Sequence, residues 1–222
     1  MILQTDETII DHFYSFIEND SFPCVGAKRA LVKKNIHVML ANRFDSSDGD
    51  NDILKYAYNF IGKYRENGEG LHSMAIIFKD RSVMDEARFE KLMWRRLQSL
   101  RDIDAAEFGY DTRVSADPLS PSFSFSIGEE AFFIVALHPS SSRQGRRFSY
   151  PTLVFNPHSQ FEKMRENGTY SRMREVNRER DIKLSGSINP MLRDYGEASE
   201  IFQYSGARHD AEWKCPFKKT NI

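Results

Sequence analysis

The sequence feature that most constrains the fold is a pair of strand-like runs joined by a short link. Residues 122–127, SFSFSI, alternate polar and apolar side chains, and residues 131–137, AFFIVAL, form an apolar run. Both patterns are typical of strands with at least one buried face. The intervening Gly128-Glu129 favours a β-hairpin, and a further run at 151–156 extends it. The sequence therefore predicts three consecutive antiparallel strands.

Helical spacing occurs on both sides of these strands. Met74–Phe78, MAIIF, is short and apolar and predicts one more buried strand. Apolar residues at intervals of three and four predict helices in the remaining segments, namely Thr5–Asn19, Ala27–Ala41, Ile53–Tyr64, Asp85–Leu100, Ser159–Glu166 and Tyr170–Asp181. We expect an α+β fold in which helices pack on a small, mostly antiparallel sheet, as a single domain over residues 1–222.

The charge balance excludes broad classes of partner. The chain has 31 basic and 32 acidic residues and a formal charge of -1, so no overall field favours nucleic acid or an anionic membrane. No window approaches the ~20 apolar residues of a membrane span, and the N-terminus lacks a signal-peptide pattern. We expect a soluble, cytoplasmic protein, with Cys24 and Cys215 as reduced thiols.

Two histidines stand next to prolines at predicted strand ends. His138 follows the second strand of the hairpin and His158 follows the third, and a strand end places a side chain with little freedom. At ~3.3 Å per residue they should lie about 20 Å apart, at opposite ends of the strands, so we do not expect them to share a metal ion. The alternative for each is a hydrogen-bonded structural histidine.

The loop between these strands is cationic and rich in hydroxyl groups. Arg143, Arg146, Arg147 and Ser141 could bind carboxylates or phosphates, because a guanidinium group binds such anions through two hydrogen bonds. The alternative is an ordinary solvated loop. The chain has no P-loop or GxGxxG pattern that would specify a nucleotide.

Cys24 lies just before a predicted helix. Lys28 and Arg29 occupy the first turn of that helix, and a helix N-terminus and nearby cations both favour a thiolate, which suits a nucleophile or a heme ligand. The alternative is a small buried side chain.

The charged helix at Tyr170–Asp181 is interpreted as a salt-bridged, solvent-exposed helix rather than a nucleic-acid-binding one.

Several separate segments, in one order, resemble a known family. These segments are FPCVGAK at Phe22–Lys28, LHPSSSR at Leu137–Arg143, RRFSYPTLVFNPHSQFE at Arg146–Glu162, SINPML at Ser187–Leu192, YGEASE and QYSG within Tyr195–Gly206, and WKCPF at Trp213–Phe217. The chain resembles the YqcI/YcgG family, and within it the branch of heme-dependent guanidine N-hydroxylases that includes the arginine N-hydroxylase of D-cycloserine biosynthesis.

The resemblance implies a protoheme (heme b) enzyme, a monooxygenase that uses O2 and an electron donor, or peroxide. Its reaction would be N-hydroxylation of a guanidine or amine nitrogen of arginine or a related small molecule. Arg143, Arg146, Arg147 and Ser141 would hold the heme propionates. For the axial iron ligand we expect His158 first, then His138, then Cys24.

The resemblance also suggests how the substrate is held. A guanidinium group needs a carboxylate, and Asp194, Glu197 and Glu200 lie in or next to the matched YGEASE segment. Their alternative role is capping or salt bridging. Ile201 and Phe202 stand where an alanine-arginine pair is expected, which weakens the expectation of strict arginine specificity.

Other functions remain open from the sequence. They are a heme-binding sensor or carrier without oxygenase activity, a non-heme enzyme that uses Cys24, and a module that binds a phosphorylated ligand. The oligomeric state is open too, including a homodimer.

Overall fold

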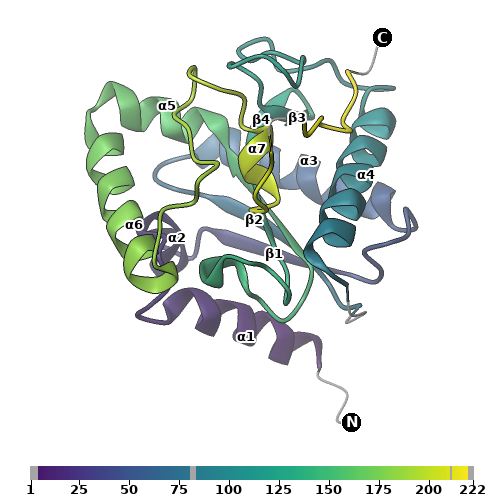
Figure 1. Cartoon of the computed structure of the whole chain (residues 1–222). Coiled ribbons are helices and arrows are strands. Elements are labelled where there is room, and N and C mark those ends of the chain that lie inside the picture. Colours follow the sequence, from purple (N-terminus) through teal and green to yellow (C-terminus); the bar gives the residue numbers. More distant parts are fainter. Residues whose placement is uncertain (1–4, 81–83, 211, 220–222) are drawn as a thin grey trace.

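The computed structural model describes residues 5–80, 84–210 and 212–219 of the chain. The elements, in chain order, are α1 (Asp6–Glu18), α2 (Val25–Val32), β1 (Ile36–Ala41), α3 (Asp50–Asn67), β2 (Ser73–Phe78), α4 (Glu86–Asp104), β3 (Phe125–Ile127), β4 (Glu130–Leu137), the 3-10 helix η1 (Gln144–Arg146), β5 (Thr152–Pro157), α5 (His158–Glu166), α6 (Thr169–Ser185) and α7 (Ile201–Tyr204). Figure 1 shows these helices packed around a central sheet. The α+β prediction is confirmed.

The strands of the described residues form one mixed sheet in the order β1-β2-β5-β4-β3. The pairs β2·β5, β5·β4 and β4·β3 are antiparallel, as predicted for the last three strands. In the predicted hairpin Ile127 pairs with Glu130, and Gly128 and Glu129 both have positive φ, at 57° and 58°. This is the backbone that a two-residue hairpin turn requires.

The predicted helix at Ala27–Ala41 is wrong in its second half. Helix α2 ends at Val32, and Ile36–Ala41 form strand β1, which pairs in parallel with β2. Lys34 has a φ of 58°, in the left-handed region, and this residue reverses the chain between helix and strand. The crossover from β1 through α3 to β2 then satisfies the geometry of a parallel pair.

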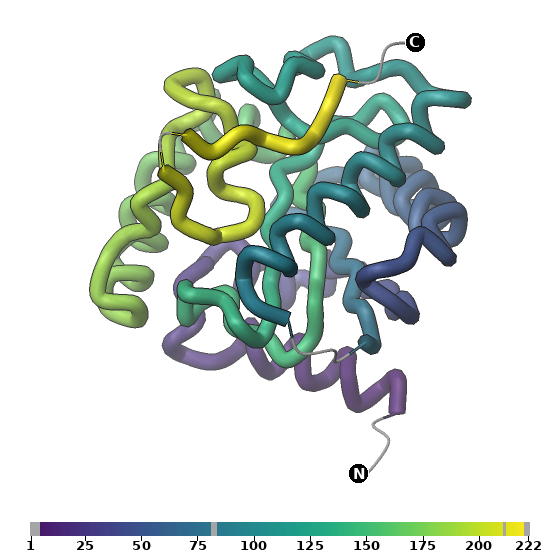
Figure 2. Tube along the Cα trace, turned by 45° about the vertical axis from the view of Figure 1, so that its right-hand side comes forward, coloured from purple at the N-terminus to yellow at the C-terminus, as the bar shows by residue number. Residues whose placement is uncertain are grey.

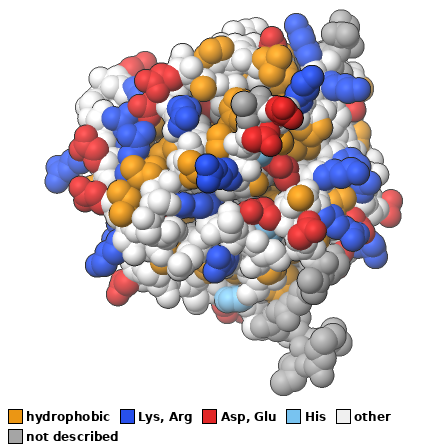
Figure 3. Space-filling model, in the orientation of Figure 1, with side chains coloured by type: hydrophobic (Ala, Val, Ile, Leu, Met, Phe, Trp, Pro, Cys, Tyr) orange, Lys and Arg blue, Asp and Glu red, His pale blue; other side chains and the backbone are white. Residues whose placement is uncertain are grey.

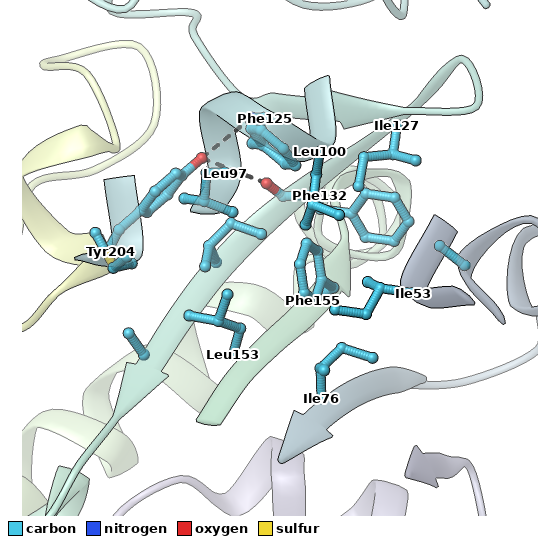
Figure 4. Close-up of a cluster of buried hydrophobic side chains, with 14 of the residues drawn as sticks. Ile53, Ile76, Leu97, Leu100, Phe125, Ile127, Phe132, Leu153, Phe155 and Tyr204 are labelled. Atoms are coloured by element: carbon cyan, nitrogen blue, oxygen red, sulfur yellow. Dashed lines mark hydrogen bonds between the residues drawn. The ribbon is translucent and has the colours of Figure 1, made fainter. Parts of the chain in front are cut away.

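One face of the sheet packs against α3, α4 and α7. Figure 4 shows this core, to which Ile53 of α3, Leu97 and Leu100 of α4 and Phe155 of β5 contribute. The Tyr204 hydroxyl group lies between two strands. It accepts a hydrogen bond from the Phe125 N–H at 3.1 Å and donates to the Phe132 carbonyl oxygen at 3.3 Å. This half of the molecule is filled by side chains.

The other face of the sheet packs against α1 and α2. Ile9, Phe13 and Ile17 of α1 are buried there, with Ala75 and Ile77 of β2. Thr5 caps α1, since its Oγ1 accepts the Thr8 N–H at 3.3 Å. Figures 1 and 2 show α5 and α6 at one side of the molecule and the C-terminal segment between them and α4.

Surface charge is mixed. Figure 3 shows basic and acidic side chains interspersed over the face seen in Figure 1, without one broad patch of either sign. Among the helices of the described residues, none has the length and apolarity to cross a membrane. Cys24 and Cys215 are free thiols.

Candidate functional site

A cavity of about 330 Å³ lies against the α1–α2 face of the sheet. Its floor consists of alternate residues of two neighbouring strands, Phe133, Val135 and Leu137 of β4 and Val154 and Asn156 of β5. Alternate residues of a strand point to one face, so these five side chains line the floor together. Among these five side chains Asn156 is the polar one, and its amide oxygen accepts a hydrogen bond at 2.7 Å from the Ser73 hydroxyl group of β2, which also lines the cavity.

Helix α6 and the segment after it form the roof. Met173, Asn177 and Asp181 of α6 line the cavity, and so do Asn189 and Leu192 beyond the helix. The wall comes from α1 and from the start of α2. The described wall residues are Phe13, Ile17, Phe22, Pro23, Cys24, Gly26 and Ala27. The cavity therefore has apolar surfaces below and beside it and a polar roof.

Arginines dominate the charge of this cavity. Among its described lining residues, six are arginines and three are carboxylates; the arginines are Arg143, Arg146, Arg165, Arg174, Arg178 and Arg193, and the carboxylates are Asp181, Asp194 and Glu200. An apolar cavity with surplus guanidinium groups favours a ligand that combines apolar surface with negative charge.

Arg143 and Arg146 bring the predicted cationic loop to one end of the cavity. Arg143 donates to the Asp181 carboxylate at 2.5 Å, and Arg146 donates to the Tyr204 carbonyl oxygen at 2.7 Å. Burial lowers the pKa of Arg146 to about 10. An anion placed here would offset that desolvation, since an opposite charge favours the ionised guanidinium group.

Arg174 and Arg178 stand one helical turn apart on the roof. Both donate to the Asp194 carboxylate, Arg178 at 3.4 Å. Each has a buried Nε that finds no hydrogen-bond partner among the described residues. Two buried donors without acceptors indicate room for an acceptor that the protein itself does not supply.

Cys24 is the one residue of the three expected iron ligands that lines the cavity in the described structure. Its Sγ caps α2, accepts the Ala27 N–H at 3.4 Å and lies 3.9 Å from the Asn177 amide nitrogen. A Cβ at Gly26 would lie 3.7 Å from Sγ and 3.2 Å from Met173 Sδ, so the glycine leaves space beside the sulfur. Burial raises the pKa of the thiol, against the effect of these donors.

The two histidines lie elsewhere. His138 packs on Phe89 of α4 with ring centroids 4.0 Å apart, on the sheet face opposite the cavity. His158 begins α5 and is buried next to Glu200, behind the cavity wall. Their places at opposite ends of β4 and β5 follow the predicted register. Among the described His, Cys, Asp and Glu residues, no group of three or more is arranged to hold a metal ion.

Two other loop residues hold the loop itself. The Ser141 hydroxyl group is buried and accepts the Arg143 N–H at 3.2 Å. Arg147 donates to the Ser141 carbonyl oxygen at 2.6 Å and faces solvent. Neither residue lines the cavity in the described structure, unlike Arg143 and Arg146.

The three expected substrate carboxylates have different positions. Glu200 lines the cavity and is 5% exposed, and Asp194 lines it but is already paired with Arg174 and Arg178. Glu197 is exposed and accepts the Asp194 N–H at 3.4 Å. Of the three, Glu200 is the buried carboxylate whose charge no arginine neutralises in the described structure.

Ile201 and Phe202, next to this carboxylate, point away from the cavity. Ile201 is fully buried in the core that α4 and α7 share, and the Phe202 ring lies 5.4 Å from that of Trp213. Their apolar character thus belongs to the packing of α7 and the C-terminal segment.

The sequence interpretation missed the roof arginines. It placed α6 in solvent, whereas Arg174, Asn177, Arg178 and Asp181 face the cavity. Their spacing of three, one and three residues places them on one side of a helix, which is the signal that the sequence did contain. Arg165, which lies over the Tyr195 and Tyr170 rings, was missed as well.

Fold and cavity together define an α+β protein with an arginine-lined, apolar-floored cavity on one face of a mixed sheet. The chain belongs to the YqcI/YcgG family, whose sequence profile matches residues 13–218. It is 24% identical over 213 residues to the "Uncharacterized protein YqcI" of Bacillus subtilis (strain 168), a match that covers 91% of this chain and 82% of that protein. No solved structure matches the chain. The family part of the resemblance is therefore confirmed.

Proposed function

We propose that this protein is a heme-dependent oxygenase that N-hydroxylates a guanidine or amine nitrogen of arginine or a related small molecule. The observation that carries the proposal is the position of the Cys24 sulfur in an apolar-floored cavity with six arginines among its described lining residues. A protoheme needs one strong iron ligand, an apolar surface for the macrocycle and cations for two propionates. Cys24, the apolar floor and the arginines among the described lining residues support the proposal on these three points.

The position of each residue in the cavity suggests which part of the heme it would hold. Cys24 would bind iron, and the α2 N-terminus and the Ala27 N–H would stabilise the thiolate, as hydrogen bonds to a ligating sulfur do. Arg143 and Arg146 would pair with propionates at the loop end. We prefer Cys24 to His158 and His138 because neither histidine lines the cavity in the described structure.

The size of the cavity makes the roof important. A rigid macrocycle with two propionates needs a wide entrance, so we expect α6 and the segment after it to move outward when heme binds. Among the described residues of α6, only Met173 is buried. The rest of the roof is held by polar contacts such as the Asn177 amide oxygen to the Val25 N–H at 2.9 Å. Polar contacts of this kind separate at lower free-energy cost than a packed core.

Bound heme would supply the oxygen activation, and the remaining work falls to the protein. Glu200 offers a buried carboxylate on the cavity wall, suited to the positive head group of a guanidine or amine. The apolar floor and the roof exclude water from the reacting nitrogen. A carrier or sensor would have no use for this anchor, and the raised pKa of Cys24 disfavours its use as a free thiolate nucleophile.

The test begins with an absorption spectrum of the protein purified with added hemin, together with a pyridine hemochrome assay. We expect a Soret band and a strongly red-shifted ferrous carbonyl band, which is the signature of thiolate ligation. Cys24→Ser should lose the red-shifted band, whereas Cys215→Ser, the matched control, should keep it. Incubation with L-arginine, oxygen and a reductant should yield a product one oxygen atom heavier.

Three results would contradict parts of this proposal. Absence of a Soret band in the wild-type protein after hemin addition would contradict heme binding. A carbonyl band of the imidazole type that disappears in His158→Ala would return the iron to His158. Heme binding without turnover of any guanidine or amine would favour a carrier.

A further inference from the structure

His158 is buried between two carboxylates. The side chain is 2% exposed, with Nδ1 3.6 Å from Glu200 Oε1 and Nε2 3.7 Å from Glu162 Oε1. The Tyr195 ring covers it at a centroid distance of 4.4 Å. Neither nitrogen forms a hydrogen bond within the described residues, although buried ring nitrogens normally do. This arrangement indicates a purpose beyond packing.

The two flanking groups are acceptors only. An ionised carboxylate has no hydrogen to give, so the ring must be the donor toward either neighbour. The separations are longer than a hydrogen bond but within ion-pair range, and small rotations of the side chains would close them. Such contacts often tighten when a ligand binds.

Glu200 is restrained on its other side as well. Its Oε2 accepts the Ser124 hydroxyl group at 3.0 Å and lies 3.3 Å from the Tyr204 hydroxyl group. The carboxylate therefore has Ser124 and Tyr204 at one oxygen and His158 at the other, and the cavity is its remaining open side. A carboxylate held this way keeps its orientation before any cation arrives.

We propose that His158 is a positioning residue that holds Glu200 as the anionic anchor for a cationic substrate head group. The inference rests on the proposed function, and it assigns His158 to the substrate end rather than to iron. With Glu162 on the far side, the ring lies between two carboxylates, and a guanidinium or ammonium group at Glu200 would bring a positive charge to this cluster.

The measurement is the dissociation constant of L-arginine by calorimetry, on the heme-loaded protein and on the protein as purified. His158→Phe keeps a ring in the same space but removes the donor, and we expect it to weaken binding by about tenfold or more. His158→Asn places an amide nitrogen near Nδ1 and should recover most of the affinity. L-citrulline, the uncharged isostere, should show little difference among these proteins.

A double-mutant cycle separates positioning from packing. If His158 acts through Glu200, the pair His158→Phe with Glu200→Gln should bind no more weakly than Glu200→Gln alone. His209→Phe is the matched control, since His209 is another buried histidine paired with a carboxylate, Glu90 at 2.6 Å, and does not line the described cavity. It should leave the dissociation constant unchanged.

The outcomes distinguish this inference from the proposed function. Three results would each contradict a positioning role for His158. They are wild-type affinity in His158→Phe, additive effects in the double-mutant cycle, and loss of the carbonyl band in His158→Phe and His158→Asn. Absence of L-arginine binding to the heme-loaded wild-type protein would overturn it too. A missing Soret band would instead overturn the heme, while arginine binding by the purified protein would still report on His158 and Glu200.

Discussion

Lys34 turns the chain from a helix into a strand, although no residue typical of such a turn marks this place in the sequence. Its positive φ ends α2 and starts the turn into β1, with the Asn35 N–H bonded to the Ala30 carbonyl oxygen at 2.9 Å. Glycine is the usual residue at such a position, and neither glycine nor proline occurs between Val32 and Ala41. The prediction from apolar spacing therefore extended the helix through the residues that form strand β1.

Replacing Lys34 with glycine should stabilise the protein. The left-handed conformation costs a residue with a Cβ about 1–2 kcal/mol, and part of this gain is offset by the flexibility of glycine when unfolded. We expect the free energy of unfolding of Lys34→Gly to rise by up to about 1 kcal/mol in urea titrations. Lys33, with a φ of -82°, provides the control, and Lys33→Gly should not stabilise.

His138 should make stability depend on pH. Burial lowers its pKa from 6.5 to about 4, and neither ring nitrogen has a hydrogen-bond partner among the described residues. Between pH 6.5 and about 4 the unfolded chain binds a proton that the folded chain does not, so this contribution to stability is present above pH 6.5 and is lost as the pH falls. The full loss is about 3 kcal/mol.

The variant His138→Phe isolates this contribution. Phenylalanine can retain the stack on Phe89 without a titrating group. Urea unfolding of both proteins from pH 8 to pH 4.5 should give curves that diverge below pH 6.5, with the variant losing less stability. Parallel curves would contradict the assignment.

The candidate site was predictable in part at the scale of residues. Cys24, Arg143, Arg146 and Glu200 were singled out from the sequence, and the structure gathers them around one cavity. His138 was singled out on the same grounds, yet its ring points to the opposite face of the sheet. Residue type and strand position suggest chemistry, but the pleat and the neighbouring helices decide which side chains meet.

At the scale of elements, α6 is the part whose role the sequence concealed. The helix carries charge on nearly every side, so no apolar stripe indicated the face that packs. Its attachment is polar, as in the Arg180 Nε to the Phe22 carbonyl oxygen at 3.3 Å and the Arg143 contact to Asp181. We therefore expect α6 to open at lower free-energy cost than a helix that is packed into the core.

Hydrogen exchange should reveal this opening. In the protein without heme, the amides of α6 should exchange faster than those of α4, whose Phe89, Met93 and Leu97 are fully buried. Added hemin should slow exchange in α6 and leave α4 unchanged, because only the former covers the cavity. Equal protection of both helices before and after hemin would contradict a movable roof.

At the scale of the whole molecule, local signals predicted the fold better than distant ones. The β3–β4–β5 meander follows from runs adjacent in the chain and a two-residue turn. The parallel pairing of β1 with β2 depends on a crossover through α3, and no short-range pattern encodes it. The cavity depends on contacts between α2, α6 and the sheet, which join residues more than 150 positions apart, such as Val25 and Asn177.

The central sheet separates a packed core on one face from the cavity on the other. On one face of the sheet, aromatic and aliphatic side chains fill the space beside α3 and α4. On the other face, α2 and α6 enclose the cavity. Substitutions among the residues that line the cavity should therefore disturb the packing beside α3 and α4 little. The shape and charge of the cavity can thus change with little loss of thermal stability.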